Sequence, residues 1–354
     1  MVEIQIYNKM KNFKLGVVTH IVTHLPEKEV NLLDVAKDIP IDNNEAEKII
    51  KTTGFTHIRQ VDNETSKDLC LTAAQKLISK LSPDEVDEID VVLFVSQTRD
   101  YIMPQTSGII QYELGLKNEV ICKDLPQGCS GYISGLMESF MFLNLGMKSV
   151  LLLAGETNTK VISHKDKSVR MVFGDGGTAT LIKSIKNSNP VSFDYGTDGS
   201  GYSDLIIKSG GLRNPINEDS TKIIHYEPGI IRSDNDMFMS GLSVMNFAIK
   251  RVPRSIKNLT SILKQDVDRY YLHQANKFMI DYLIKKSKLD SSIAPFTANK
   301  IGNTGPASIP IAICIDLERG ITPKQAVLTG FGVGLSWGSC NLDLSQIKYS
   351  AINI

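Results

Sequence analysis

The alternation of apolar and polar residues predicts buried strands that take turns with amphipathic helices. Residues 13–22, 89–96 and 149–155 are predicted as strands, and the last two are continuous apolar runs, as expected for strands buried on both faces. Residues 67–81 and 107–116 have apolar residues at helical spacing, and the second helix ends with a glycine signal. This alternation indicates parallel sheets covered by helices, and therefore an α/β fold.

A weak internal repeat divides the chain. Residues 129–155 and 303–330 each contain a helix start rich in small residues, then a helix, then a buried strand that ends in glycine. A similar pairing links the strand, loop and helix of 89–116 to a segment that begins at Val267. The repeat indicates two halves with the same order of elements.

The two predicted halves bring candidate residues to equivalent places. We expect a first half at residues 1–185 that contains Cys129, and a second half at 186–354 that contains His273 and Asn303. Cys129 and Asn303 would then begin matching helices, and His273 would follow the matching earlier strand. Pseudo-twofold packing would bring the three side chains to one central site.

The composition is ordinary for a soluble globular chain and argues against several classes of partner. Among 354 residues, Lys+Arg and Asp+Glu both number 39, so no global basic field favours nucleic acid or an anionic membrane. The sequence shows no transmembrane run and no signal-peptide pattern, so we expect a cytoplasmic protein. The five cysteines include no C-x-x-C pair, which indicates neither a disulfide framework nor a zinc site.

Cys129, in "QGCSGYISGL", is the candidate nucleophile. It precedes a predicted helix, and a helix N-terminus offers unpaired N–H groups and partial positive charge that would favour the thiolate. The alternative is a structural cysteine, because free cysteine commonly packs as a small buried hydrophobe.

His273 and Asn303 are candidate site residues because of their positions next to a predicted strand and a predicted helix. His273 opens "HQAN" just past a buried strand, where α/β folds place ligand-binding residues, and Asn303 lies in a "GNTGPAS" turn before a helix. The alternatives are a hydrogen-bonded buried histidine and a turn-forming asparagine. Papain-like proteases have the same Cys, His, Asn order, but their local cysteine signature is absent here.

Two glycine-rich segments follow the strands of the repeat. Residues 173–181, "FGDGGTATL", predict a tight turn between strands, and residues 329–339, "TGFGVGLSWGS", predict a loop suited to aim a backbone N–H at an oxyanion. Neither matches a phosphate loop or a dinucleotide fingerprint, because the residues that complete those motifs are missing.

Taken together, five ordered motifs resemble the thiolase superfamily, and within it the β-ketoacyl-acyl-carrier-protein synthase III family. The motifs are "DLPQGCSGY", "VFGDGGTATL", "YLHQAN", "GNTGPASIP" and "GFGVGLSWGS", and the likeness covers nearly the whole chain. It implies a thiolase-like α/β fold in which two pseudo-symmetric halves form a five-layered α-β-α-β-α sandwich. It also implies a homodimer with sheets paired across the interface.

The resemblance implies a decarboxylative Claisen condensation. Cys129 would take the acyl group from a thioester, with the backbone N–H groups of Cys129 and Val333 forming an oxyanion hole. His273 and Asn303 would hold the thioester carbonyl of a malonyl-type extender and stabilise the enolate formed as CO₂ leaves. The substrates would be pantetheine thioesters of acyl-carrier protein or coenzyme A, with no metal and no tightly bound cofactor.

Further positions match the family's substrate and partner contacts. Gly241 and Asn276 match the pantetheine channel, and Met103 matches a residue that caps the acyl pocket across the dimer. Lys285 and Lys286 match basic positions that dock the acidic carrier protein. The alternative for this lysine pair is a solvated helix end.

Two departures from the family concern the substrate. Relatives that start from acyl-coenzyme A often have a Trp and an Arg where this chain has Lys48 and Thr52, which favours a carrier-bound acyl donor. Pro126 and Gln127 stand where many relatives are alanine-rich, which suggests a reshaped pocket floor. Acyl transfer to a hydroxyl or amine, or a non-catalytic partner subunit, are the alternative functions. The acyl chain, the extender and the pathway stay open.

Overall fold

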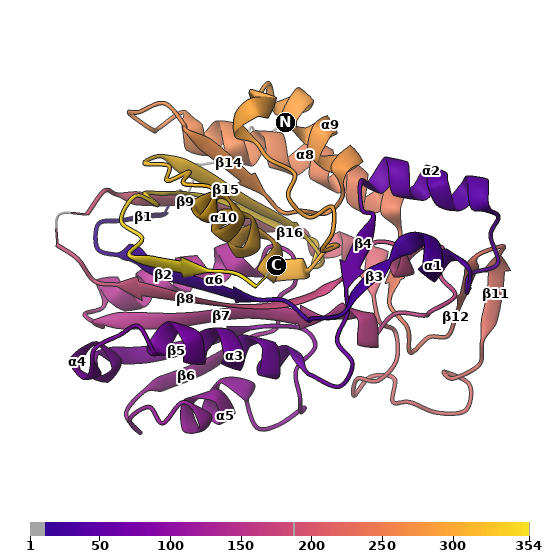
Figure 1. The fold of residues 1–354 in the computed structure, drawn as a ribbon, viewed down its shortest axis with the longest axis horizontal. Coiled ribbons are helices and arrows are strands. Elements are labelled where there is room, and N and C mark those ends of the chain that lie inside the picture. The colour runs from indigo at the N-terminus through magenta and orange to yellow at the C-terminus, as the bar shows by residue number, and fades with distance from the viewer. Residues whose placement is uncertain (1–10, 187, 354) are drawn as a thin grey trace, which may run out of the picture.

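Two β-sheets and three layers of helices build the protein (Figure 1). The computed structural model describes residues 11–186 and 188–353. The layers follow the order helix, sheet, helix, sheet, helix, so the expected five-layered α-β-α-β-α sandwich is confirmed.

The first sheet has six strands and is covered on its outer face by three helices. In spatial order its strands are β17 (Tyr349–Ala351), β2 (Val17–His24), β8 (Asp175–Lys183), β7 (Ser149–Thr157), β5 (Ile89–Val95) and β6 (Ile121–Leu125). The outer helices are α3 (Ser66–Ile78), α4 (Pro83–Asp87) and α5 (Thr106–Glu113). The apolar runs predicted as strands at 89–96 and 149–155 form β5 and β7, and the predicted helices form α3 and α5.

The second sheet has five strands and lies on the other side of the central helices. In spatial order its strands are β1 (Lys11–Phe13), β9 (Val191–Thr197), β16 (Ser336–Leu342), β15 (Ala326–Gly332) and β14 (Arg269–Leu272). Its outer helices are α8 (Gly241–Thr260) and α9 (Lys277–Ser287). The central helices are α6 (Gly131–Asn144) and α10 (Ser308–Glu318).

The internal repeat is visible in the strand pairing of the two sheets. β5 and β7 are parallel, and β7, β8 and β2 then pair antiparallel in turn. In the same pattern, β14 and β15 are parallel, and β15, β16 and β9 pair antiparallel. The order of strand, helix and strand that the sequence repeats therefore becomes a repeated sheet topology.

β1, near the start of the chain, belongs to the second sheet, and β17, near its end, belongs to the first sheet, which the sequence did not predict. The run 13–22 was expected to be one strand, but it belongs to two: β1 pairs with β9 in the second sheet, and β2 pairs with β8 in the first. Gly16, between them, has a φ of +130°, a conformation that L side chains rarely adopt, and it allows the chain to change direction there. Near the other end of the chain, β17 pairs with β2 of the first sheet. The division at residues 185 and 186 stays a prediction.

The central helices are apolar on nearly all sides because both sheets pack on them. α10 is buried from Ser308 to Asp316, and α6 contacts β5 and β7 on one side and β15 and β16 on the other. A helix without a polar face is stable only when it is buried on all sides. The start of each central helix therefore lies deep between the two halves.

Two of the three glycines in segment 173–181 lie in a strand and Gly174 directly precedes it, so the prediction of a tight turn between strands there is wrong. Gly176 and Gly177 belong to β8, which pairs with β7 and β2. A Cβ at Gly177 would lie 2.6 Å from the backbone of Leu69 and Cys70 in α3. Glycine is needed here for close packing of helix on strand.

The remaining elements lie beside the sandwich or in its connections. They are β3 (Glu29–Asn31), α1 (Leu32–Ala36), α2 (Asn43–Thr53), β4 (His57–Arg59), α7 (Lys167–Arg170), β10 (Leu205–Ile206), β11 (Ile224–Glu227), β12 (Ile230–Arg232) and β13 (Phe238–Met239). Short 3₁₀ turns span Asn158–Lys160, Gly199–Asp204, Ser291–Ile293 and Gly305–Ala307.

Candidate active site

Cys129 lies in the connection between β6 and α6, directly before the helix cap Ser130. The backbone N–H of Gly131 donates to the carbonyl of Gly128 at 2.7 Å, so the chain turns tightly around the cysteine. The Cys129 side chain is 7% exposed. Its predicted place at the N-terminus of a buried helix is confirmed.

Burial dominates the chemistry of this thiol. It raises the pKa of Cys129 to about 12, the charge of Glu156 acts in the same direction, and a hydrogen bond from the Val333 backbone acts against them. Backbone N–H groups, including that of Cys129 itself, do act towards the thiolate as predicted, but desolvation is the larger effect and the net pKa is raised. At neutral pH the side chain is a thiol, and its proton must leave during nucleophilic attack.

The backbone N–H of Val333 reaches the nucleophile from the turn between β15 and β16. The preceding residue, Gly332, has a φ of +154°, and a Cβ there would lie 2.7 Å from Cys129 Cβ and 2.9 Å from its Sγ. Only glycine allows the turn to come this close. The glycine-rich segment 329–339 is thus a β-hairpin whose turn contacts Cys129.

A chain of hydroxyl groups holds this turn in place. The Ser336 hydroxyl donates to the Val333 carbonyl at 2.8 Å and lies 2.7 Å from the Ser130 hydroxyl, next to the nucleophile. Ser130 lies 3.4 Å from the Tyr195 hydroxyl, which donates to Gln127 Oε1 at 3.2 Å. Each hydroxyl can act as donor and acceptor at once. The network therefore joins the Val333 turn to the start of α6.

The suggestion that Pro126 and Gln127 reshape the pocket floor is not supported. Neither residue lines either of the cavities that border Cys129. Gln127 instead accepts the hydrogen bond from Tyr195 at the end of the hydroxyl network. Its side chain supports the nucleophile turn, and the cavity wall is made by other residues.

His273 follows β14 directly and is almost completely buried, at 1% exposed. Its backbone N–H donates to the Thr329 carbonyl at 2.8 Å, and its Nδ1 lies 2.7 Å from Ser308 Oγ at the start of α10. The Phe331 ring meets the imidazole edge to face, with centroids 5.5 Å apart. Burial lowers the pKa of His273 to about 3, against the effect of a hydrogen bond with the Gly305 backbone, so the imidazole is neutral at physiological pH.

Asn303 is held by both halves of the molecule. Its backbone N–H donates to the Val172 carbonyl at 2.9 Å, and its own carbonyl accepts from Gly174 N–H at 3.0 Å. Its side-chain Oδ1 accepts from Gly305 N–H at 3.0 Å, which leaves Nδ2 as the donor end of the amide. A 3₁₀ turn at Gly305–Ala307 separates Asn303 from α10, whereas only the cap Ser130 separates Cys129 from α6. The two residues therefore have similar but not identical positions relative to the central helices.

One small cavity brings the three candidate residues together. Cys129, His273 and Asn303 all line a space of about 70 Å³, and Gly241 and Asn276 line it as well. The sequence placed these residues in distant segments, and the pseudo-twofold packing of the sheets joins them. Asn276 also caps α9, because its Oδ1 accepts from Met279 N–H at 2.8 Å.

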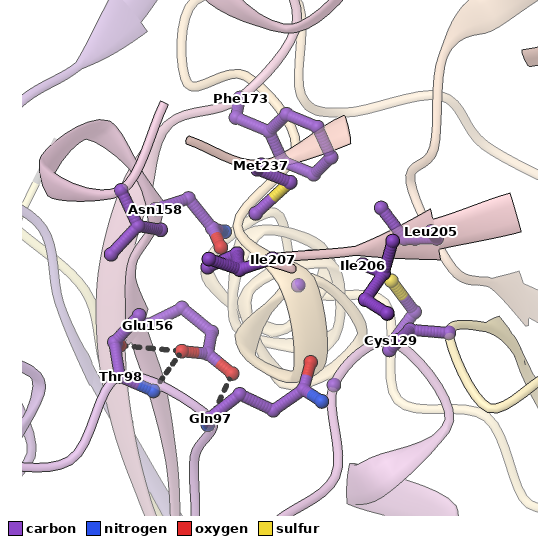
Figure 2. A pocket seen from close by; sticks show the side chains of 14 residues that line it. Gln97, Thr98, Cys129, Glu156, Asn158, Phe173, Leu205, Ile206, Ile207 and Met237 are labelled. Atoms are coloured by element: carbon purple, nitrogen blue, oxygen red, sulfur yellow. Dashed lines mark hydrogen bonds between the residues drawn. The ribbon is translucent and has the colours of Figure 1, made fainter. Parts of the chain in front are cut away.

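A larger cavity of about 300 Å³ lies on the other side of Cys129 (Figure 2). Its apolar wall includes Val161, Phe173, Leu205, Ile206, Ile207, Met237 and Val333. Cys129, Phe173 and Leu205 border both cavities. The nucleophile therefore stands between a small cavity with polar side chains and a larger, mainly apolar one.

Sequence reasoning missed four polar residues that line the larger cavity, namely Gln97, Thr98, Glu156 and Asn158. Glu156 accepts hydrogen bonds from the backbone N–H of Gln97 at 2.8 Å and of Thr98 at 3.0 Å, and from two hydroxyls. Burial raises its pKa to about 7 against these bonds. The available signal was the change from an apolar run to "ETNT" at the end of the predicted strand.

Comparisons with known proteins identify the family of this chain. Residues 123–199 match the family model described as 3-oxoacyl-[acyl-carrier-protein] synthase III, and residues 259–344 match the model of its C-terminal part. A crystal structure of a 3-oxoacyl-(acyl-carrier-protein) synthase III is 33% identical, with a TM-score of 0.87 over 93% of this chain and 99% of that one. The chain belongs to the 3-oxoacyl-[acyl-carrier-protein] synthase III family. It is a condensing enzyme of this type, in the transferase class.

Two further relatives support membership in the synthase III family. The 3-oxoacyl-(acyl-carrier-protein) synthase of Burkholderia xenovorans is 30% identical, with a TM-score of 0.88 over 98% of this chain and 99% of that one. The β-ketoacyl-[acyl-carrier-protein] synthase III of Streptococcus pneumoniae is 29% identical over 92% of this chain and 98% of its own length.

The residues expected to meet partners of this synthase III family member lie on its surface. Met103 is 80% exposed, and Lys285 and Lys286 are exposed in the last turn of α9. Lys48 and Thr52 are exposed on α2, which packs against α9. Their positions allow contact with large ligands, and their roles stay predictions.

No helix within residues 11–186 and 188–353 has the length and apolarity that a membrane crossing requires. Over the same ranges, no three or more His, Cys, Asp or Glu side chains gather in an arrangement that could hold a metal ion.

Proposed function

We propose that this synthase III family member joins an acyl group to a malonyl-type thioester by decarboxylative Claisen condensation, with Cys129 as nucleophile. The observation that carries the proposal is the shared cavity of Cys129, His273 and Asn303. A thiol, an imidazole and a carboxamide are the groups needed for covalent acyl transfer and for holding an enolate oxygen.

In the first step Cys129 takes the acyl group. Its sulfur forms a bond to the thioester carbon, the bond from that carbon to the donor sulfur breaks, and the thiol proton passes to the departing thiolate. The oxyanion formed on the way accepts hydrogen bonds from the backbone N–H groups of Cys129 and Val333. The Val333 turn already donates to the sulfur, so only a small shift is needed to reach the adjacent oxygen.

In the second step the extender loses CO₂, and the electron pair of the broken bond forms an enolate. Asn303 Nδ2 and the His273 imidazole donate hydrogen bonds to the enolate oxygen. Ser308 Oγ accepts from the Gln274 N–H at 3.4 Å, so its own hydrogen can go to His273 Nδ1 and leave a hydrogen on Nε2. The enolate carbon then attacks the acyl carbon, the bond to Cys129 breaks, and the released thiolate takes a proton from water.

The donor and extender are pantetheine thioesters, and an acyl-carrier protein is the proposed partner. Gly241 and Asn276 would face the pantetheine arm, since they line the cavity that contains the three catalytic candidates. α8 and α9 pack together, and besides the lysine pair they expose Lys250, Arg254 and Lys257. A basic surface of this kind would dock an acidic carrier protein in a salt-dependent way.

Coenzyme A is the less favoured carrier of the first acyl group. The exposed Lys48 and Thr52 provide neither the aromatic ring nor the guanidinium expected to clamp an adenine. The proposed assembly is a homodimer in the cytoplasm. Acyl transfer to a hydroxyl or amine, the alternative considered from the sequence, would not need both enolate donors.

Intact-mass spectrometry and CO₂ release test the proposal with one set of proteins. The wild-type protein, an acyl thioester and malonyl-carrier protein should give an acyl adduct on Cys129, then CO₂ and a 3-oxoacyl product. Cys129→Ala should give no adduct, whereas Cys122→Ala, at a half-buried cysteine on β6, should keep it. Asn303→Ala should still be acylated but release CO₂ about 100-fold more slowly, because one enolate donor is lost.

The outcomes separate the two steps. An adduct on another cysteine would overturn the role of Cys129. Equal loss of acylation and CO₂ release in Asn303→Ala would overturn the assignment of Asn303 to the second step. Absence of any adduct with coenzyme A, pantetheine and carrier-protein donors would overturn the proposed function.

A further inference from the structure

The larger cavity beside Cys129 is polar at its far side. In Figure 2, Asn158 and Glu156 lie across the cavity from the Cys129 sulfur, with apolar side chains between them. An acyl group held on Cys129 would extend away from the sulfur and meet these two residues with its distal part.

Asn158 carries a donor that no residue in the described ranges satisfies. The side chain is 6% exposed, and its Nδ2 is buried without a hydrogen-bond partner in residues 11–186 and 188–353. Figure 2 shows the amide end of Asn158 turned into the cavity. An unpaired buried N–H costs about 1–3 kcal/mol, so such a group points to a ligand that completes it.

Glu156 is already satisfied by its own surroundings. Its Oε1 accepts from Gln97 N–H, and its Oε2 accepts from the Thr98 N–H and from the Ser96 and Thr98 hydroxyls. These hydrogen bonds hold the loop after β5 in place. Glu156 lines the cavity as a carboxylate or a carboxylic acid whose oxygens are already hydrogen-bonded. The open polar contact in the cavity is therefore the Asn158 amide.

The charges around the cavity limit the ligand further. None of the cavity-lining residues in the part of the chain that the structure describes is Lys, Arg or His. A distal carboxylate would have no cation to pair with and would face Glu156, which disfavours it. A neutral oxygen, as in a hydroxyl or ketone, accepts the Asn158 hydrogen bond without this penalty.

We propose that Asn158 selects an acyl group that carries a neutral hydroxyl or carbonyl oxygen on its chain. The inference rests on the proposed function, because it assumes an acyl group on Cys129. Asn158 is then a residue that determines substrate specificity. The acyl substrate carries an oxygen substituent and is not a plain fatty acyl group.

Competition between matched pantetheine thioesters tests the inference on the wild-type protein. The pairs are 4-hydroxybutanoyl against pentanoyl, and 3-hydroxybutanoyl against 3-methylbutanoyl, with Cys129 adducts counted by intact mass. We expect the hydroxylated member to acylate about tenfold faster or more in at least one pair, because the plain member leaves the donor unpaired. Equal rates in both pairs, or preference for the plain members, would overturn the proposal.

Charged analogues probe the limits of the site. The 3-carboxypropanoyl thioester should be slower than 4-hydroxybutanoyl, since it faces Glu156 without a cation. The 4-aminobutanoyl thioester should also be slower, because an ammonium has no acceptor for the Asn158 N–H and the Glu156 oxygens already accept hydrogen bonds from Ser96, Gln97 and Thr98. If the amino analogue were the fastest, Glu156 would be the recognising group and the assignment to Asn158 would be wrong.

Asn158→Leu should remove or reverse the preference, because the amide is replaced by an apolar side chain of similar size. Ile207→Leu changes an apolar side chain of the same cavity and should keep the preference, whatever it does to the absolute rate. A preference that survives in Asn158→Leu would overturn the role of Asn158. If no thioester of any kind acylates Cys129, the proposed function itself has failed, which the total adduct separates from a lost preference.

Discussion

At the scale of single residues, the surroundings of Cys129 control whether its side chain carries a proton. Burial and the neighbouring Glu156 favour the thiol, and the Val333 N–H favours the thiolate less strongly. The same burial keeps His273 neutral, with a pKa of about 3. The site therefore combines a neutral nucleophile with a neutral imidazole, and the charge in the reaction arrives with the carboxylate of the extender.

Alkylation of Cys129 should accordingly accelerate steadily with pH. The pKa of about 12 lies far above neutrality, so the thiolate fraction and the rate with iodoacetamide should rise about tenfold per pH unit from pH 7 to pH 9. Intact-mass kinetics would measure the rate. Cys129→Ser would report the background from the other four cysteines. A plateau with a midpoint below pH 8 would contradict the high pKa.

At the scale of elements, the β15–β16 hairpin and α6 act as one unit. The hairpin turn supplies the Val333 N–H, and the Ser336 and Ser130 hydroxyls connect it to the first residues of the helix. Both serines are buried, so the 2.7 Å contact between them is shielded from water. Ser336 acts on the reaction through Val333, as a positioning residue.

Ser336→Ala should loosen this turn. The Val333 carbonyl loses its buried donor, and the free energy of unfolding should fall by about 1–3 kcal/mol. The kcat should fall about tenfold or more while KM changes little, because the displaced N–H matters most when the oxyanion forms. Steady-state kinetics and urea unfolding would measure both effects.

The controls for this variant distinguish a displaced Val333 turn from a general loss of stability. Ser336→Thr keeps the hydroxyl and should restore kcat. Ser345→Ala removes a hydroxyl that donates to Asp343 beyond the opposite end of β16, and should leave kcat near the wild-type value. An unchanged kcat in Ser336→Ala, or a kcat lost equally in Ser345→Ala, would argue against a positioning role.

At the scale of the whole molecule, one edge of the first sheet and a nearby loop are exposed in a way that fits the proposed dimer. β6 is the last strand of that sheet and has no neighbour on its outer side within the described chain. The connection after β5 exposes three consecutive apolar residues, Tyr101, Ile102 and Met103. An unpaired edge and an exposed apolar loop are features that a second subunit commonly covers.

Light scattering should therefore give twice the mass of one chain. Met103→Ala should extend the acyl chain length accepted by Cys129, because a smaller side chain would cap the partner's larger cavity. Competition between thioesters of increasing length would measure this shift. Leu212→Ala, at a residue that is 91% exposed, is the matched surface control and should leave the preference unchanged. A monomer, or an unchanged preference in Met103→Ala, would contradict the role of Met103 across the dimer.

Local sequence was enough to predict the elements whose burial is uniform. The runs that form β5 and β7 are apolar throughout, and α3 has regular helical spacing, so their type follows from the chain alone. The run 13–22 was harder because two strands of different sheets follow one another across Gly16. Periodicity within a segment carries no information about which sheet receives it.

The sequence by itself determined that Cys129 directly precedes an apolar helix, that the chain repeats one topology, and which family it belongs to. These features depend on residue order, on apolar periodicity and on motifs that can be recognised one at a time. Only the tertiary structure decided the direction of the Cys129 pKa shift, the support of the Val333 turn by Gln127 and the serines, and the Asn158 Nδ2 that finds no partner among the described residues. The physical reason is that desolvation and hydrogen-bond satisfaction depend on which distant groups come within a few ångströms, and that is fixed only when the two sheets close on the central helices.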